Sequence, residues 1–243
     1  MNRRNLLAAG VAALALSASF APVRAEDPIK IGLVLPLTGP FTSTGKEIVA
    51  AAELYNKEAG ASVAGRKVEL VIKDDGGVPD VTKRLVQEMI VNDHVTAVAG
   101  FGLTPLALAA APVATQGQTP MVVMAAATSI ITERSPFIVR SSQVVPQIAG
   151  PFGTWAAKQG MKKVVTIVTD YGPGHDVEKW FSQTFKEGGG TVENMRVPLQ
   201  NPDFSPFLQR AADAKPDAVL VFVPSGVGAQ FMKQFVERGL DKS

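Results

Sequence analysis

The chain has 243 residues, with 24 Lys and Arg against 22 Asp and Glu, a formal net charge of +2, and no cysteine. The lack of cysteine excludes disulfides, thiolate catalysis and zinc–thiolate sites. The nearly balanced charge gives no indication of a nucleic-acid partner, which would favour a clearly basic chain.

Residues 1–25 have the three parts of a secretory signal peptide. Arg3 and Arg4 precede a short apolar run over 6–16, and small residues lead to a cleavage site after Ala25. The run is shorter than the ~20 residues that a membrane-spanning helix needs. We therefore expect export to the periplasm, and the arginine pair also approximates a twin-arginine signal. Without this leader the net charge of the chain is about −1.

From residue 29 onward, β-branched apolar runs alternate with amphipathic stretches of helical period. Gly60 ends the first of these stretches, and Pro105 lies in the first turn of a later one, as is usual at helix ends. Such alternation is typical of an α/β fold in which helices cover both faces of a parallel sheet. In chain order we expect a strand over 29–37, a helix over 45–60, a strand over 67–75, a helix over 78–93, a strand over 95–101, a helix over 104–117 and a strand over 120–126.

The alternation stops over residues 128–147 and then resumes. This segment contains two prolines, several hydroxyl side chains and one strand-like run at 137–140, so we interpret it as a crossover into a second lobe. We assign residues 26–142 to an N-terminal ligand-binding lobe and residues 143–243 to part of a second lobe, joined by hinge strands. The second lobe is expected to contain a strand over 164–170, a helix over 176–189, a strand over 190–199, a helix over 203–215, a strand over 216–225 and a helix over 227–239.

The stretch GPFTSTGKE after the first strand superficially resembles a phosphate-binding loop. However, five residues separate Gly39 from Gly45 where a P-loop has four, and Glu47 follows Lys46 where a P-loop has Ser or Thr. We therefore do not expect a nucleotide here. A helix N-terminus still favours a carboxylate, so Thr44 is predicted either to cap the helix or to contact a ligand.

Three more loops follow the carboxyl ends of predicted strands, over 100–105, 124–129 and 169–176. Ligands of open parallel sheets bind at that edge, so these loops predict a binding site. Tyr171 lies in a glycine-rich turn there and is expected to contact the ligand. No G-x-S-x-G or G-x-G-x-x-G motif is present. We expect a protein that is not an enzyme, with no catalytic residue, no cofactor and no metal.

Seven ordered segments carry a resemblance to a known family: KIGLVLPLTGPFTSTGKE, VELVIKDDGGVPDVT, VTAVAGFGLT, PMVVMAAATS, VVTIVTDYGPG, NPDFSPFLQRAADAKPDAVLVFVPSG and AQFMKQFVERGL. Together they resemble the leucine/isoleucine/valine-binding family of type I periplasmic solute-binding proteins over the whole mature chain. The resemblance implies two Rossmann-like lobes that close about a hinge on a small ligand. It also implies a monomeric substrate-binding protein of an ABC transporter, which delivers a small carboxylate to a membrane permease.

The resemblance also implies site residues. The loop after the third strand would hold the ligand carboxylate through Gly102, Leu103 and Thr104. The next loop would contribute Ala126, Ala127 and Thr128, and the second lobe would contribute Tyr171, Pro224 and Ser225. Thr44 and Phe101 stand where the family often has other side chains, and we expect them to reshape the pocket wall.

Two questions stay open at the level of sequence. The ligand could be a branched-chain or other hydrophobic amino acid, or an aromatic or other carboxylate without an ammonium group. A sensory ligand-binding module of the same fold is the alternative to a transport protein. Family members are longer than this chain, so we expect the sequence to be a fragment or the product of a truncated gene, with an incomplete second half.

Overall fold

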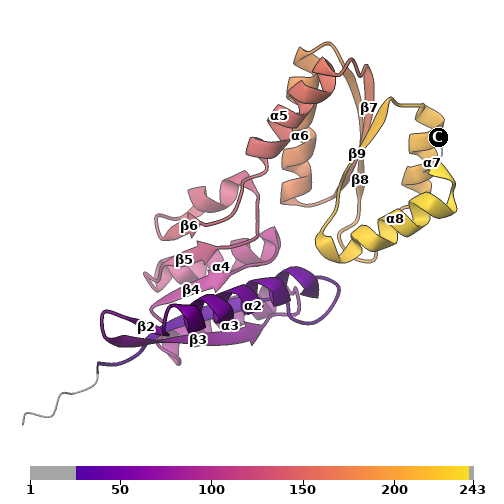
Figure 1. Cartoon of the computed structure of the whole chain (residues 1–243). Coiled ribbons are helices and arrows are strands. Elements are labelled where there is room, and N and C mark those ends of the chain that lie inside the picture. The colour runs from indigo at the N-terminus through magenta and orange to yellow at the C-terminus, as the bar shows by residue number, and fades with distance from the viewer. Residues whose placement is uncertain (1–25, 241–243) are drawn as a thin grey trace, which may run out of the picture.

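The structure is a computed structural model that describes residues 26–240. The predicted signal peptide and its cleavage site lie outside these residues. Two separate sheets are present, and each is covered by helices on both faces (Figure 1). The α/β class with parallel sheets is thus confirmed. None of the described helices is long and apolar enough to cross a membrane.

The first sheet has six strands in the order β2-β3-β1-β4-β5-β6. All neighbouring strands pair in parallel except β2 and β3, which are antiparallel. The chain therefore builds outward from β1 in one direction and then in the other, which places a switch point between β1 and β4. The strands are β1 (Ile29–Leu35), β2 (Ser62–Val63), β3 (Arg66–Asp74), β4 (Ala97–Gly100), β5 (Met121–Val123) and β6 (Ile138–Arg140).

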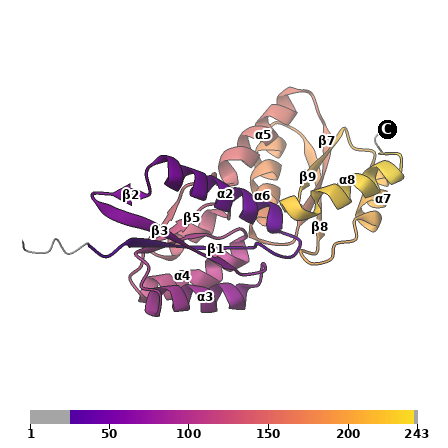
Figure 2. The ribbon, with the colours of Figure 1, turned by 60° about the horizontal axis from the view of Figure 1, so that its bottom comes forward.

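The helices of this first lobe lie on opposite faces of its sheet (Figure 2). α2 (Thr42–Glu58) covers one face, while α3 (Pro79–Val91) and α4 (Thr104–Gln116) cover the other. Side chains alternate between the faces along a strand, so Leu33 and Leu35 pack on the α2 side and Val34 packs on the other. A short 3-10 helix, η1 (Ser129–Arg134), precedes β6.

The second lobe has a three-stranded parallel sheet in the order β8-β7-β9. α5 and α6 cover one face of this sheet, and α7 and α8 cover the other. Its central strand again has neighbours on both sides, so a second switch point lies between β7 and β9. The elements are α5 (Pro146–Lys158), β7 (Lys163–Thr169), α6 (Gly172–Glu187), β8 (Thr191–Val197), α7 (Ser205–Ala214), β9 (Ala218–Phe222), η2 (Ser225–Val227) and α8 (Gly228–Glu237).

Several elements differ from the sequence expectations: the short strand β2 was not expected, and α2 begins at Thr42, three residues before the expected start. α5 was not expected at all, because Pro146, Gly150 and Pro151 are typical helix breakers. Here Pro146 lies in the first turn, where its missing N–H costs nothing, and tight packing explains one further glycine: a Cβ on Gly153 would overlap Thr184 of α6. α6 also begins at Gly172, four residues before the expected start.

The chain passes from the first sheet to the second through residues 141–145, which form no regular element. Val145 donates a backbone hydrogen bond to the carbonyl of Ala127, so this crossing is tied to the loop after β5. The proposed division of the chain at residues 142 and 143 falls within it and stays a prediction.

Gly100 at the end of β4 provides a test of this packing. Its φ is +115°, and an added Cβ would overlap the carbonyl oxygen of Val34. Gly100→Ala should therefore lower the free energy of unfolding by about 3 kcal/mol or more. Gly160 is the matched control, because its φ is +83° but nothing lies within 4 Å of an added Cβ.

We expect Gly160→Ala to cost only about 1 kcal/mol, the penalty of the left-handed backbone itself. Urea unfolding followed by circular dichroism measures both variants. Equal losses for the two alanine variants would contradict the packing described for Gly100.

Candidate functional site

A cavity of about 180 Å³ lies between the two lobes, at the carboxyl ends of their strands. The loops after β1, β4 and β5 form one wall, and the ends of β7 and β9 form the other. Both switch points therefore open onto the same space, which is where open parallel sheets bind ligands. The cavity is lined by Phe41, Thr44, Gly102, Leu103, Thr104, Ala125, Ala126, Ala127, Gln143, Tyr171, Pro173, Phe222, Val223, Pro224 and Ser225.

The first lobe presents the N-terminus of α4 to this cavity. The helix begins at Thr104 after Leu103, and no side chain caps it. The Thr104 and Thr128 hydroxyls lie 2.7 Å apart, and either oxygen could be the donor. Each hydroxyl has one proton and only one proton lies between the two oxygens, so the pair keeps a second proton for another acceptor. Together with the positive end of the helix, this arrangement suits a carboxylate.

The loop after β1 is held in place by Asp74 at the end of β3. Its Oδ1 accepts hydrogen bonds from the backbone N–H groups of Leu37 and Thr38, at 2.7 and 3.2 Å, and its Oδ2 accepts one from the Thr38 hydroxyl at 2.6 Å. Burial acts to raise the pKa of Asp74, but hydrogen bonds to Thr38, Gly76 and Leu37 outweigh it and lower the pKa. The ionised carboxylate thus fixes the loop that leads to Phe41 and Thr44.

Hydroxyl groups of the two lobes meet at one edge of the cavity. The Ser225 Oγ lies 2.8 Å from the Thr44 Oγ1 and 3.1 Å from the Ser43 Oγ. These contacts join α2 of the first lobe to η2 of the second. The described structure is therefore one in which the lobes touch.

Tyr171 extends from the second lobe, just before α6 begins. Its ring packs with Phe41, Leu103 and Leu106 of the first lobe. Burial raises the pKa of Tyr171, so its phenol stays protonated and can donate a hydrogen bond. No hydrogen bond joins this hydroxyl to any other described residue, which leaves it available to a ligand.

The lobes approach closely at two glycines. An added Cβ on Gly172 would lie 2.5 Å from the Thr128 Oγ1 and 3.1 Å from the Thr104 Cγ2. An added Cβ on Gly226 would overlap the carbonyl group of Pro40. Only residues without a side chain can occupy these positions while the lobes are in contact.

The cavity has no formal charge on its wall. Among the described residues that line it, none is Asp, Glu, Lys, Arg or His. Likewise, no group of three or more His, Asp or Glu within residues 26–240 could hold a metal ion. The wall combines small, aliphatic and aromatic side chains with hydroxyl groups and the amide of Gln143.

The sequence-predicted site residues mostly come together here. Nine of them line the cavity: Thr44, Gly102, Leu103, Thr104, Ala126, Ala127, Tyr171, Pro224 and Ser225. Their direct contact with a ligand stays a prediction. Thr128 lies behind the wall and reaches the site through Thr104. The expectation that Thr44 caps α2 is wrong, because Phe41 is the N-cap residue and no side chain makes a cap hydrogen bond.

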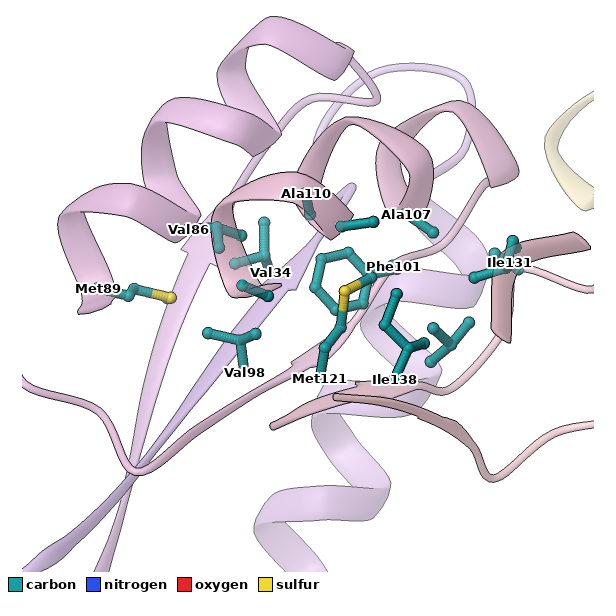
Figure 3. Packing of buried hydrophobic residues seen from close by; sticks show 14 of the residues in the cluster. Val34, Val86, Met89, Val98, Phe101, Ala107, Ala110, Met121, Ile131 and Ile138 are labelled. Carbon is teal, nitrogen blue, oxygen red and sulfur yellow. The ribbon is translucent and has the colours of Figure 1, made fainter. Parts of the chain in front are cut away.

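Phe101 does not lie in the pocket wall, contrary to expectation. Its φ of +64° turns the side chain back into the first lobe, where it is fully buried near Val34 and Met121 (Figure 3). The pattern of the sequence does not reveal a left-handed residue other than glycine.

Six lining residues were not predicted: Phe41, Ala125, Gln143, Pro173, Phe222 and Val223. Phe41, Ala125 and Pro173 stand within loops that were already singled out. Phe222 and Val223 lie inside the strand predicted over 216–225, which ends earlier than expected, at Phe222. Gln143 lies on the crossing segment, and nothing in the sequence marks it.

Comparisons with known proteins agree on one family. A family described as "Periplasmic binding protein" matches residues 28–243. The Leu/Ile/Val-binding protein homolog 6 of Brucella melitensis is 42% identical over 100% of this chain, which spans 62% of that relative's length. A solute-binding protein of an ABC transporter from Rhodopseudomonas palustris BisB5, solved with 3,4-dihydroxybenzoic acid, is 59% identical with a TM-score of 0.87, over 89% of this chain and 60% of that one. Another from R. palustris, solved with 4-hydroxybenzoate, is 40% identical with a TM-score of 0.85 and the same coverage.

The close approach at Gly226 predicts a change of shape on substitution. Gly226→Ala should prevent the lobes from touching, because its methyl group overlaps backbone atoms of Pro40. The radius of gyration from small-angle X-ray scattering should rise, while the melting temperature stays within about 2 °C, since the residue belongs to neither hydrophobic core.

Gly228→Ala is the matched control, because nothing lies within 4 Å of an added Cβ there. It should leave the radius of gyration unchanged. An unchanged radius for Gly226→Ala as well would show that the lobes do not meet at this point in solution.

Proposed function

The chain belongs to the periplasmic binding protein family, and from this membership we propose that it serves as the substrate-binding protein of an ABC transporter. The family implies an extracytoplasmic location. Export through the leader over residues 1–25, cut after Ala25, belongs to the proposal, as does the twin-arginine route. Since the chain spans only about three-fifths of its relatives' length, transport by the whole protein is also part of the proposal.

The proposed ligand is a small aromatic carboxylate of the benzoate type. The observation that carries this proposal is the uncharged wall of the interlobe cavity, which combines a free helix N-terminus with apolar side chains. The carboxylate would accept hydrogen bonds at Gly102, Leu103 and Thr104, and Tyr171 would cover the ring. Two similar solved proteins hold hydroxybenzoates, which supports the same class here.

An amino acid is the alternative ligand, and the name of the Brucella relative favours it. A ligand ammonium group taken out of water needs a carboxylate or several carbonyl oxygens as partners. No described residue with a carboxylate lines the cavity. This difference in charge makes the benzoate class the better fit to the described site.

Capture would proceed by closure of the two lobes. In the described arrangement the lobes touch at Gly172, Gly226 and Ser225, so a ligand in the cavity would be enclosed from both sides. The closed form would then be recognised by a membrane permease. In this proposal the protein acts as a monomer and has no enzymatic activity. A sensory module of the same fold would use the same closure but present it to a receptor.

Thr104→Val tests the proposed carboxylate contact. The change removes a hydroxyl but keeps the shape, so binding of 3,4-dihydroxybenzoate or 4-hydroxybenzoate should weaken by about 10- to 100-fold, the value of a hydrogen bond to a charged group. Isothermal titration calorimetry measures this, with leucine as the competing ligand class. Thr115→Val is the control, because the Thr115 hydroxyl bonds the carbonyl of Ala111 within the same helix.

The control variant should bind as the parent does. Binding of leucine with no response to either benzoate would overturn the aromatic assignment and support the amino-acid alternative. Equal affinity of Thr104→Val and the parent for a benzoate would remove Thr104 from the site.

A further inference from the structure

The loop between β5 and η1, residues 124–128, and Ser129 at the start of η1 make hydrogen bonds to several other elements. The loop supplies Ala125, Ala126 and Ala127 to the cavity wall. At its end, the Thr128 hydroxyl bonds Thr104, and the Thr128 carbonyl accepts a hydrogen bond from the Arg140 Nη2 at 2.5 Å. The position of this short loop therefore determines both the wall and the hydroxyl pair.

A carboxylate of the second lobe binds Ser129, directly after this loop. Asp176 lies on α6, and its Oδ2 accepts a hydrogen bond from the Ser129 backbone N–H at 2.8 Å. Its Oδ1 accepts a longer one from the Ser129 hydroxyl at 3.3 Å. Ser129 belongs to the first lobe, so these bonds exist only while the lobes are together.

The negative charge of Asp176 also acts on the Arg140 guanidinium of the first lobe. Burial lowers the pKa of Arg140, and the negative charge of Asp176 acts in the opposite direction. The Arg140 Nε is buried and has no hydrogen-bond partner within the described part of the chain. The charge of Asp176 thus offsets part of the cost of burying Arg140, a half-buried cation of the first lobe.

We propose that Asp176 is a positioning residue that couples closure of the lobes to the shape of the ligand pocket, through its hydrogen bonds to Ser129. This inference rests on the proposed function, in which the lobes close on a ligand. When the lobes separate, Ser129 loses its bonds to Asp176, and the loop over 124–128 keeps only the bonds from its own lobe. When they meet, Asp176 holds the end of the loop and so holds Ala125–Ala127 against the ligand.

Glu178 provides a matched control on the same helix. Its carboxylate bonds the Arg196 Nε at 2.6 Å, and both residues belong to the second lobe. Removal of Glu178 therefore takes one carboxylate from the same helix and breaks an ion pair within the second lobe, without changing the contact between the lobes.

Closure can be measured without any ligand, because the chain has no cysteine. Ser43 and Ser225 lie on opposite lobes with their hydroxyl oxygens 3.1 Å apart. In the double variant Ser43→Cys with Ser225→Cys, a disulfide can form only when the lobes meet. Adding Asp176→Ala should slow its formation under a fixed glutathione buffer by about tenfold or more. Adding Glu178→Ala should change the rate by less than about twofold.

A second variant acts from the other side of the contact. Ser129→Pro removes the backbone N–H group that donates a hydrogen bond to Asp176. Ser129 is the first residue of η1, a position where proline is tolerated. It should slow disulfide formation as Asp176→Ala does, and the two changes together should be little worse than either alone. Equal rates for Asp176→Ala, Glu178→Ala and the parent would overturn the proposal.

Ligand kinetics then distinguish this inference from the proposed ligand. In the chain without cysteines, Asp176→Ala should raise the dissociation rate of 4-hydroxybenzoate about tenfold and change its association rate by less than about threefold. If 4-hydroxybenzoate binds no variant, the proposed ligand is wrong, and the disulfide rates alone decide the role of Asp176.

Discussion

The two lobes can touch only because the chain carries no side chain at two points of contact. Gly172 faces the Thr104 and Thr128 hydroxyl pair, and Gly226 lies against the backbone of Pro40. A methyl group at either position would displace one lobe from the other. The dimensions of the cavity, the contact of Ser225 with Thr44 and the bond from Asp176 to Ser129 all depend on this approach.

The chemistry of the cavity follows from parallel sheets. Each sheet has a switch point beside its central strand, and the loops there expose backbone N–H groups and short side chains. The first lobe adds a helix N-terminus, which attracts negative charge without a cationic side chain. Because the described wall is otherwise uncharged, a second charge on a ligand would find no ion-pair partner there.

Most elements could be predicted from the sequence, because periodicity and terminal residues act locally. Apart from β2, the strands of both sheets and the helix α4 begin and end within a few residues of expectation. α5 could not be predicted, since its prolines and glycines oppose a helix and only packing against α6 explains Gly153. Phe101 was misplaced because its backbone is left-handed, with a φ of +64°, a conformation that a residue other than glycine does not reveal in the sequence.

The sequence by itself determined the class of fold and the loops that face the site, because alternating patterns and strand ends are properties of local segments. It also excluded thiol chemistry, since it contains no cysteine. Only the tertiary structure decided which residues meet, including Thr104 with Thr128 within the first lobe and Asp176 with Ser129 across the two lobes. These pairs lie 24 and 47 residues apart in the chain, and no local pattern encodes the angle at which two separately packed sheets come together.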